Sequence, residues 1–364
     1  MKNKKKIIFF INSLKMGGAE KQFTQLINLL SANHEVFAIT LESTRVDFYK
    51  INNHIKRYSC NQKKQNSFFH KVTNLIKIIT TIRKIVKDIK PTVIISFLPI
   101  PSLIILMATF DHKAKKVVSI RNNPSYTNYS FFWKLVDFFV TNSIDTMVVQ
   151  TKTLQKELKK KHKHKKIISI ANFKSDLKLK KTEWKNTIYP PKKPFLLAVG
   201  KIHMQKGLDI LIKSYFEVLR KGHNIDLYIL SNSKNIDFKY LKLLKTLIKD
   251  FNITKKVKII YDVRNLNQWY KKCHLYILCS RYEGYPNSLV EAMKNSCDII
   301  SFDCKFGPKE ILQNKKYLIK KPSILKLTDC IVSTLKDGYK KKNIIKEINQ
   351  YNDANIIKKW NAVI

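Results

Sequence analysis

The sequence predicts an α/β protein built from two parallel-sheet domains. Short apolar runs of strand length alternate with amphipathic stretches of helix length through both halves of the chain. The length of 364 residues suits two domains. The chain has only 8 glycines, and most follow predicted strands. Because alternating strands and helices imply parallel sheets with right-handed crossovers, we expect two Rossmann-like domains that face each other across a cleft.

The first half contains six predicted strands, at Ile7–Ile11, Glu35–Thr40, Thr92–Phe97, Val117–Ile120, Met147–Gln150 and Ile167–Ile170. The helices predicted between them are Ala19–Leu30, Phe68–Asp88, Tyr129–Val140 and Lys152–Lys161. The second half repeats the alternation with strands at Phe195–Val199, Leu227–Leu230, Val257–Ile260, Leu275–Cys279 and Asp298–Phe302. Its helices are predicted at Leu208–Arg220, Asp237–Lys249, Asn265–Lys271 and Ser288–Lys294.

The joint between the domains is predicted at Lys185–Pro194, where three prolines precede a new strand. The expected domains are therefore residues 1–185 and 186–345. Residues 346–364 are expected to form a helix that returns to the first domain.

Composition indicates a globular cytoplasmic protein. Hydrophobic residues make up 44% of the chain, and the six cysteines show no CxxC spacing, which favours buried, reduced thiols. Lysines followed by Ile7–Ile11 resemble a signal peptide, but the apolar stretch is short and runs into polar Asn12 and Ser13. A first strand is the better interpretation.

The formal net charge is +44. It has two explanations: attraction to an anionic partner, such as lipid headgroups, nucleic acid or a diphosphate, or a compositional bias that places lysines on every face. A nucleic-acid-binding protein is one alternative, but the chain shows no aromatic stacking motif, helix-turn-helix pattern or zinc spacing. The histidines lack metal-ligand spacing and no Asp-x-Asp triplet occurs, so we expect neither a metal nor a cofactor.

Three segments have more than one interpretation. Val93–Phe110 is apolar and long enough to span a bilayer, but its prolines favour a strand followed by a buried helix. The run Lys159–Lys166 is expected to be a solvated turn. Phe68–Lys90 is expected to be a peripheral helix, and its basic side leaves a membrane-surface role open. The apolar face predicted for it consists of Phe68, Val72, Leu75, Ile79, Ile82 and Val86, opposite His70, Lys77 and Lys84.

The segment Arg281–Met293 (RYEGYPNSLVEAM) carries the strongest indication of function. It follows an apolar strand and reads as a tight loop and the start of a helix, with Asn287 or Ser288 as the N-cap. The N-terminus of such a helix favours a phosphate, while Glu291, one turn into it, is suited to accept hydrogen bonds from hydroxyls. Phosphate and hydroxyl sites side by side suggest a nucleotide sugar.

Glycines strengthen this interpretation, since a chain with so few retains them where a side chain is not tolerated. Six of the 8 lie at predicted strand-to-helix turns, where α/β sheets bind ligands: Gly17, Gly18, Gly200, Gly207, Gly284 and Gly307.

Four segments in order resemble the bacterial retaining glycosyltransferases of family 4, which have the GT-B fold. They are Asn12–Glu20 (NSLKMGGAE), Val199–Gly207 (VGKIHMQKG), Glu283–Glu291 (EGYPNSLVE) and Gly307–Ile311 (GPKEI). The last resembles a variant common among transferases that build capsule, O-antigen and protein-linked glycans. The third is the most specific, because it reproduces the family's pair of glutamates separated by seven residues.

The resemblance implies roles for individual residues. Gly17 and Gly18 would close on the donor diphosphate, and Lys201 and Lys206 would neutralise it as it leaves. Glu283 would approach the transferred sugar.

Within the same segment, Gly284 and Tyr285 belong to the donor-binding loop. The backbone amides of Asn287, Ser288 and Leu289 would hold phosphate, and Glu291 would bind the ribose. Arg121 lies where many relatives have a histidine and is a candidate to contact donor or acceptor; a surface salt bridge is the alternative.

The chain departs from the family pattern at four places. Lys201 replaces the usual arginine and loses its bidentate geometry. Tyr261 stands where glycine is frequent, Asn295–Asp298 replaces an Ala-x-Gly-x-Pro connection, and Asn172 lacks the proline that often follows it. These differences imply either an altered donor choice or a drift towards weak activity.

The expected function is transfer of a hexose or N-acetylhexosamine, with galactose or N-acetylgalactosamine favoured, from a UDP-sugar to a lipid-linked saccharide. The enzyme is expected to be cytoplasmic and peripheral on the inner face of the plasma membrane, in contact with anionic lipid and not with nucleic acid. Another GT-B enzyme, such as a nucleotide-sugar epimerase, is the other alternative.

Overall fold

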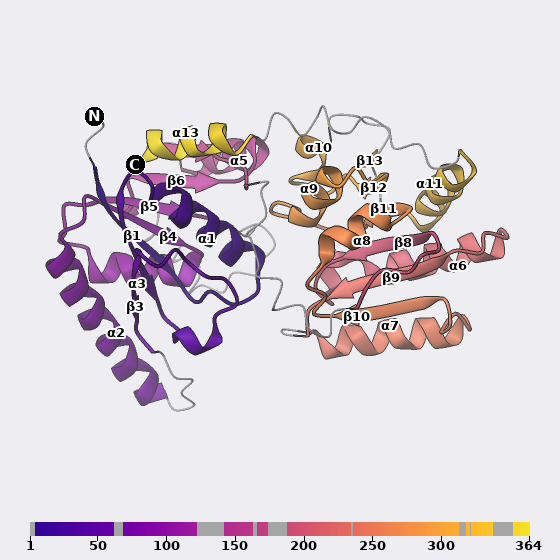
Figure 1. The fold of residues 1–364 in the computed structure, drawn as a ribbon, viewed down its shortest axis with the longest axis horizontal. Coiled ribbons are helices and arrows are strands. Elements are labelled where there is room, and N and C mark those ends of the chain that lie inside the picture. Colours follow the sequence, from indigo (N-terminus) through magenta and orange to yellow (C-terminus); the bar gives the residue numbers. More distant parts are fainter. Residues whose placement is uncertain are drawn as a thin grey trace. The chain divides into compact units, whose positions relative to one another are not determined.

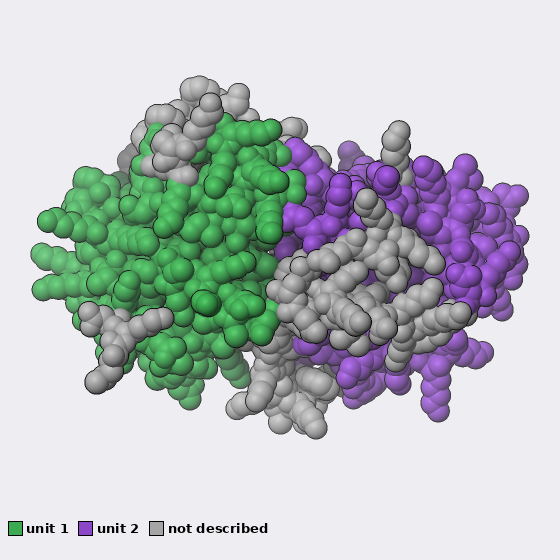
Figure 2. Space-filling view, turned by 90° about the horizontal axis from the view of Figure 1, so that it is seen from above, with its two compact units in different colours: residues 1–177, 351–364 green, residues 178–350 purple. Residues whose placement is uncertain are grey.

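The computed structural model describes residues 4–61, 68–121, 142–162, 166–173, 188–233, 236–312, 318–320, 322–337 and 352–364. The chain divides into two compact units (Figure 2). Unit 1 comprises Met1–Leu177 and Tyr351–Ile364, and unit 2 comprises Lys178–Gln350. The predicted boundary at residue 185 falls outside the described residues.

Unit 1 contains a parallel sheet of seven strands in the order β3-β2-β1-β4-β5-β6-β7 (Figure 1). The strands are β1 (Lys6–Ile11), β2 (Glu35–Thr40), β3 (Lys56–Ser59), β4 (Val93–Phe97), β5 (Lys115–Ser119), β6 (Thr146–Val149) and β7 (Lys166–Ser169). The described helices are α1 (Gly18–Leu30), η1 (Thr44–Val46), α2 (Phe68–Ile89), α3 (Pro99–Ala108), α5 (Lys152–Lys161) and α13 (Asp353–Val363).

The core of unit 1 explains why the C-terminal helix α13 belongs to it. The Trp360 ring of α13 stacks on Phe97 of β4, with ring centroids 6.3 Å apart. Phe97 makes an edge contact with Phe23 of α1, which makes another with Phe9 of β1. Because these side chains are almost fully buried, the C-terminal segment is part of the hydrophobic core rather than an appendage.

Unit 2 contains a parallel sheet of six strands in the order β10-β9-β8-β11-β12-β13. The strands are β8 (Phe195–Val199), β9 (Asp226–Ser231), β10 (Val257–Tyr261), β11 (Leu275–Leu278), β12 (Ile299–Phe302) and β13 (Leu318–Ile319). The described helices are η4 (Met204–Lys206), α6 (Leu208–Arg220), α7 (Phe238–Asp250), α8 (Leu266–Lys272), α9 (Asn287–Lys294), α10 (Pro308–Ile311) and α11 (Ile324–Lys336).

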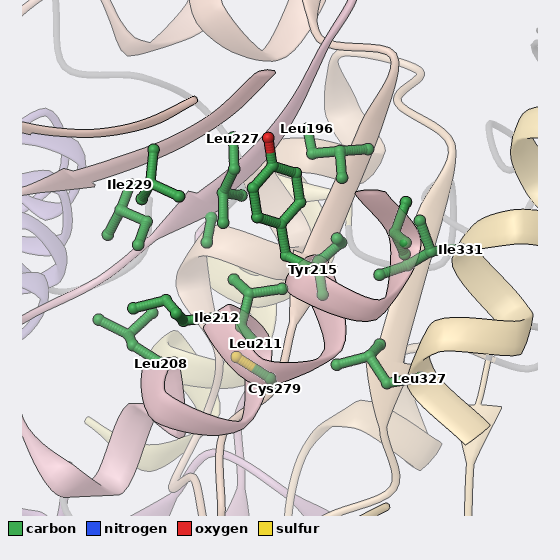
Figure 3. Packing of buried hydrophobic residues seen from close by; sticks show 14 of the residues in the cluster. Leu196, Leu208, Leu211, Ile212, Tyr215, Leu227, Ile229, Cys279, Leu327 and Ile331 are labelled. Carbon is green, nitrogen blue, oxygen red and sulfur yellow. The ribbon is translucent and has the colours of Figure 1, made fainter. Parts of the chain in front are cut away.

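Helix α6 lies at the centre of the unit 2 core (Figure 3). Its buried face, with Leu211 and Tyr215, packs between the sheet and α11, which contributes Leu327 and Ile331. The hydroxyl of Tyr215 donates to the carbonyl oxygen of Ile225 at 2.6 Å, so this buried polar group is satisfied. The hydrogen bond ties the middle of α6 to the residue that precedes β9.

The two-domain parallel α/β fold predicted from the sequence is confirmed. The segment Val93–Phe110 is a strand followed by a helix, as favoured. Among the described residues, no helix combines the length and the apolar character needed to cross a bilayer. The helix predicted at Tyr129–Val140 lies outside the described residues. The six cysteines have free thiols, and four of them are buried.

Several local predictions were wrong. Strands β3 and β13 and helix α11 were not foreseen, because β3 is a polar, half-exposed edge strand and β13 has only two residues. Helix α5 has the predicted bounds, its last turn Lys159–Lys161 is exposed to solvent, and residues 163–165 of the basic run lie outside the described residues. In α2 the buried face is Ile78, Ile82, Val86 and Ile89, while Val72 is exposed.

Candidate active site

The sheet order of unit 2 places its candidate site between β8 and β11. These strands are neighbours, and the connections that leave β8 and β11 turn to opposite sides of the sheet. In open α/β sheets, ligands bind at the carboxyl ends of the strands at such a topological switch point. The β8 loop (Gly200–Gly207) and the β11 loop (Cys279–Pro286) therefore meet where a ligand is expected.

A buried ion pair joins the two loops. The Lys206 ammonium lies 2.5 Å from Oε1 of Glu283, and the two side chains are only 18% and 5% exposed. The hydroxyl of Ser280 donates to the same oxygen at 2.6 Å. Removing the Glu283 charge from water is costly, and the Lys206 ammonium and the Ser280 hydroxyl compensate for that cost. Two of the predicted site residues are thus brought into direct contact.

Arg281 clamps the same loops together from the other side. Its guanidinium donates to both carboxylate oxygens of Asp209, at 2.8 and 2.7 Å, and to the carbonyl oxygen of Met204 at 2.7 Å. Its backbone N–H donates to the carbonyl oxygen of Gln205 at 2.8 Å, and the Gln205 amide donates back to the carbonyl oxygen of Tyr282 at 2.9 Å. No role for Arg281 or Asp209 was predicted from the sequence.

The electrostatics of this clamp are consistent with a permanent ion pair. Burial alone would raise the pKa of Asp209, but hydrogen bonds from Arg281 and Tyr240 outweigh it and lower that pKa. The hydrogen bonds with Asp209 raise the pKa of Arg281. A bidentate arginine–carboxylate pair also fixes geometry. Arg281 contacts Met204 and Asp209, which lie on either side of Lys206 in the chain, so the clamp holds the backbone at Lys206 in position.

Gly207 ends the β8 loop in a conformation that requires glycine. Its φ is +62°, and a Cβ atom built there would lie 2.1 Å from the carbonyl oxygen of Cys279. The thiol of Cys279 donates to the carbonyl oxygen of Lys206 at 3.2 Å. The two loops thus touch backbone to backbone, as expected from the scarcity of glycine in this chain.

The β11 loop leads into α9, whose first turn differs from the prediction. Pro286 occupies the N-cap position, and no side chain caps the helix, so the predicted cap by Asn287 or Ser288 was wrong. The Ser288 hydroxyl instead accepts a hydrogen bond from Tyr276 at 2.8 Å. The N–H of Leu289 donates to the carbonyl oxygen of Pro286 at 3.0 Å and is already used within the turn.

The Gly307–Ile311 segment packs against the same turn. The φ of Gly307 is +96°, and a Cβ atom there would lie 2.4 Å from the Pro286 ring. The sequence motif at residues 307–311 is therefore in contact with the start of α9, where the phosphate was predicted.

Glu291 stands one turn into α9, as predicted, and is half-buried. The hydroxyl of Tyr270 donates to its Oε2 at 3.3 Å. Burial, together with the charge of Glu291, raises the pKa of Tyr270 well above its ordinary value, so the phenol remains a donor. Tyr270 thus holds the Glu291 carboxylate in position. This contact was not predicted from the sequence, because nothing near Tyr270 in the chain indicates a partner 21 residues away.

The other predicted residues of unit 2 lie in the same two loops, except Tyr261, which lies on another strand. Lys201 follows β8, is exposed, and makes no ion pair within the described part of the chain. Tyr285 is buried, and Gly284 lies beside Glu283 in the β11 loop. Tyr261 ends β10, which is separated from β11 by the two strands β9 and β8.

In unit 1, Gly17 and Gly18 connect β1 to α1. Gly17 is the N-cap of α1 in an extended conformation, and a Cβ atom there would meet only the flexible Glu20 carboxylate. The expectation that a side chain is not tolerated there was therefore wrong for Gly17. In this sheet β1 and β4 form the switch point, so the loop is at the edge where a ligand is expected.

Arg121 follows β5 at the same edge of the unit 1 sheet. Its guanidinium carbon lies 4.4 Å from the centroid of the Phe97 ring, and it donates to the amide oxygen of Asn172. These two contacts join Arg121 to an aromatic ring and a neutral amide.

Comparison with known proteins identifies the second half of the chain. Residues 180–351 match the family model described as glycosyl transferases group 1. The second half of the chain is therefore similar to this family. The match contains the β8 loop, the β11 loop, α9 and the Gly307–Ile311 segment.

Two proteins illustrate the likeness over most of the chain. An undecaprenol-diphosphate-linked glycan α-1,4-N-acetyl-D-galactosaminyltransferase of Campylobacter jejuni is 24% identical over 85% of this chain and 82% of its own length. Anabaena Alr3699/HepE, solved in complex with UDP and glucose, has a TM-score of 0.78 at 15% identity and covers 98% of both chains. The GT-B fold and the resemblance to bacterial glycosyltransferases of capsule and lipid-linked glycans are confirmed.

Proposed function

We propose that this protein is a retaining glycosyltransferase that moves a hexose or N-acetylhexosamine from a UDP-sugar to a lipid-linked saccharide. The observation that carries the proposal is the Lys206–Glu283 pair, held at a topological switch point by the Arg281 clamp. The Campylobacter jejuni relatives act on undecaprenol-diphosphate-linked glycans, which favours N-acetylgalactosamine and a lipid-linked acceptor.

In the proposed reaction, the bond between the anomeric carbon and the β-phosphate oxygen breaks while an acceptor hydroxyl bonds to that carbon. The hydroxyl proton passes to the departing phosphate, so the products are UDP and the extended saccharide. Negative charge grows on the diphosphate in the transition state. Lys206, Lys201 and the N-terminus of α9 would stabilise that charge more than they stabilise the bound donor, which is the requirement for catalysis.

Each residue of the site has a distinct part in this scheme. Lys206 is positioned to exchange its carboxylate partner for a phosphate, and exposed Lys201 supplies a second, mobile cation. Glu283 would then be available to the sugar hydroxyls. The amides of Asn287 and Ser288 would hold phosphate, and Glu291, oriented by Tyr270, would accept hydrogen bonds from the ribose.

Contributions from unit 1 are proposed on its own geometry. Gly17 and Gly18 would contact the donor diphosphate from the loop after β1. Arg121, which lies over the Phe97 ring, would contact donor or acceptor. The scheme requires no metal. The proposed location is the cytoplasmic face of the plasma membrane, where a lipid-linked acceptor would be reached.

A transfer assay tests the proposal. Purified protein is incubated with UDP-sugars labelled in the sugar and with an undecaprenol- or shorter polyprenol-diphosphate-linked saccharide, and the labelled product is separated. The expected result is transfer with release of UDP, and a loss of about 100-fold or more in kcat/KM for Lys206→Met. The matched control is Lys245→Met, an exposed lysine on α7. Donor consumption without any acceptor, or full activity of Lys206→Met, would contradict the proposal.

A further inference from the structure

Helix α3 has an exposed side that is entirely apolar. Ile100, Met107 and Phe110 are 48%, 44% and 72% exposed, and Leu103, between them, is half-buried. Their spacing places them on one side of α3 and its continuation. The polar side chain within α3, Ser102, is buried and hydrogen-bonded to Ser96. The exposed surface of this helix therefore lacks the polar cover that a water-facing helix has.

Helix α2 extends this surface. It packs beside α3 at one edge of unit 1 (Figure 1). Val72 and Ile76 are 42% and 57% exposed, on the side of α2 that also bears Arg83. Arg83 lies over the Phe110 ring at 5.2 Å and pairs with Asp111 at 2.5 Å, so this side of α2 adjoins the exposed side of α3.

These side chains define the α2–α3 apolar patch: Val72, Ile76, Ile100, Met107 and Phe110. In the described part of the chain, the other exposed large apolar side chains lie on α1, η4, α7 and α11 and in the segment before β8. Single exposed apolar residues need no explanation, but a group on two adjacent helices marks an interaction site.

The border of the patch is basic. Exposed lysines stand on α2 at Lys77, Lys84 and Lys87, and after α3 at Lys113. Asp111 is paired with Arg83, and the acidic residue exposed on α2 itself is Asp88. An apolar centre bordered by cations complements a bilayer with anionic headgroups.

We propose that the α2–α3 apolar patch docks this protein on an anionic lipid bilayer. The five apolar side chains would enter the headgroup–acyl boundary, and the bordering lysines would meet lipid phosphates. A second copy of the chain fits less well, because self-association would bring two basic borders together. The inference rests on the proposed function in one respect: a lipid-linked acceptor lies in such a bilayer.

The test is co-sedimentation of the full chain with vesicles of phosphatidylcholine alone or with phosphatidylglycerol. The wild-type protein is expected to bind the mixed vesicles. The double variant Met107→Gln/Phe110→Ser removes apolar contact, and binding should weaken about tenfold for each side chain. The double variant Lys77→Gln/Lys84→Gln should weaken binding to mixed vesicles about fivefold for each lysine and reduce the preference for phosphatidylglycerol.

The matched control is Phe238→Ser. Phe238 is 76% exposed, as much as Phe110, but it lies on α7 in unit 2. Its loss should leave vesicle binding unchanged. Thermal unfolding of each variant checks that it is folded, and sedimentation velocity without vesicles checks for self-association.

Equal vesicle binding by the wild type and the Met107→Gln/Phe110→Ser variant would overturn the inference. So would a wild-type dimer that this variant converts to a monomer, because the patch would then be an interface between copies. Sugar transfer to a short-chain, water-soluble acceptor is measured in parallel. If transfer persists while vesicle binding is unaffected by the patch variants, the patch assignment fails and the proposed function stands. If neither the wild type nor any variant transfers sugar, the proposed function fails.

Discussion

The Lys206–Glu283 pair makes a quantitative prediction about the stability of the candidate site. A double-mutant cycle with Lys206→Met, Glu283→Gln and both together measures how strongly the two side chains are coupled. Methionine and glutamine keep the approximate shape of the originals, so the charges are the main change. The quantity compared is the free energy of unfolding.

The magnitudes follow from exposure and contacts. In Lys206→Met, Glu283 remains 5% exposed, and the Ser280 hydroxyl still donates to the oxygen that faced the lysine. Leaving a buried charge uncompensated costs about 3–5 kcal/mol. In Glu283→Gln, the lysine is 18% exposed and can turn towards water, so we expect a smaller loss of about 1–2 kcal/mol. The double variant should recover most of the first loss, which gives a coupling of about 2–3 kcal/mol.

The assay is equilibrium urea unfolding of the full chain, with a surface pair in the same unit as control. Lys221 and Asp329 lie 2.8 Å apart and are 47% and 64% exposed. The same cycle there should give a coupling of about 0.2–1 kcal/mol, as for other exposed pairs. A coupling at Lys206–Glu283 no larger than at this control pair would refute the claim that the site is a buried, preorganised ion pair.

Three further predictions concern other parts of the fold. Gly207→Ala should lower the free energy of unfolding by about 2 kcal/mol or more, because φ is +62° and a Cβ atom would lie 2.1 Å from a backbone oxygen, whereas an unchanged melting temperature would contradict this. Burial raises the pKa of Cys279 and of Cys304 to about 12. As the pH rises, these thiols therefore ionise in the unfolded chain before they ionise in the folded protein. The free energy of unfolding should fall between about pH 9 and pH 12, by at most about 1.4 kcal/mol per pH unit for each thiol. In Cys304→Ala this fall should be smaller in urea titrations, and an equal slope would count against it. Trp360→Ala should destabilise unit 1 by about 3–5 kcal/mol through loss of the stack on Phe97, and calorimetry showing no change would contradict that packing.

Much of the fold was predictable because buried parallel strands are continuous apolar runs. Ile7–Ile11 and Leu275–Leu278 are read directly from the sequence for this reason. The polar edge strand Lys56–Ser59 could not be found this way, since it is stabilised by pairing with β2 and not by its own burial. Helix α2 shows a second limit: periodicity gives a helix but assigns Val72 to the wrong side, because the choice of buried face depends on the packing partner.

The candidate site was predictable to the extent that its chemistry is local in sequence. Glu283 and Glu291 stand in one motif, and Lys206 adjoins a glycine whose conformation is special. The clamp of Arg281 on Asp209 joins residues 72 positions apart, and the hydrogen bond from Tyr270 to Glu291 depends on the packing of α8 beside α9. Such contacts are set by the meeting of elements in space, so a single sequence gives no direct indication of them.

Binding of UDP tests the account most directly. Isothermal titration of UDP into the full chain should show binding that Lys206→Met weakens about 10- to 100-fold, the value of one charge-assisted hydrogen bond, while Lys245→Met binds as the wild type does. Equal affinity of Lys206→Met and the wild type, or no binding of UDP to any of the three, would contradict the assignment of the donor diphosphate site to the β8 and β11 loops.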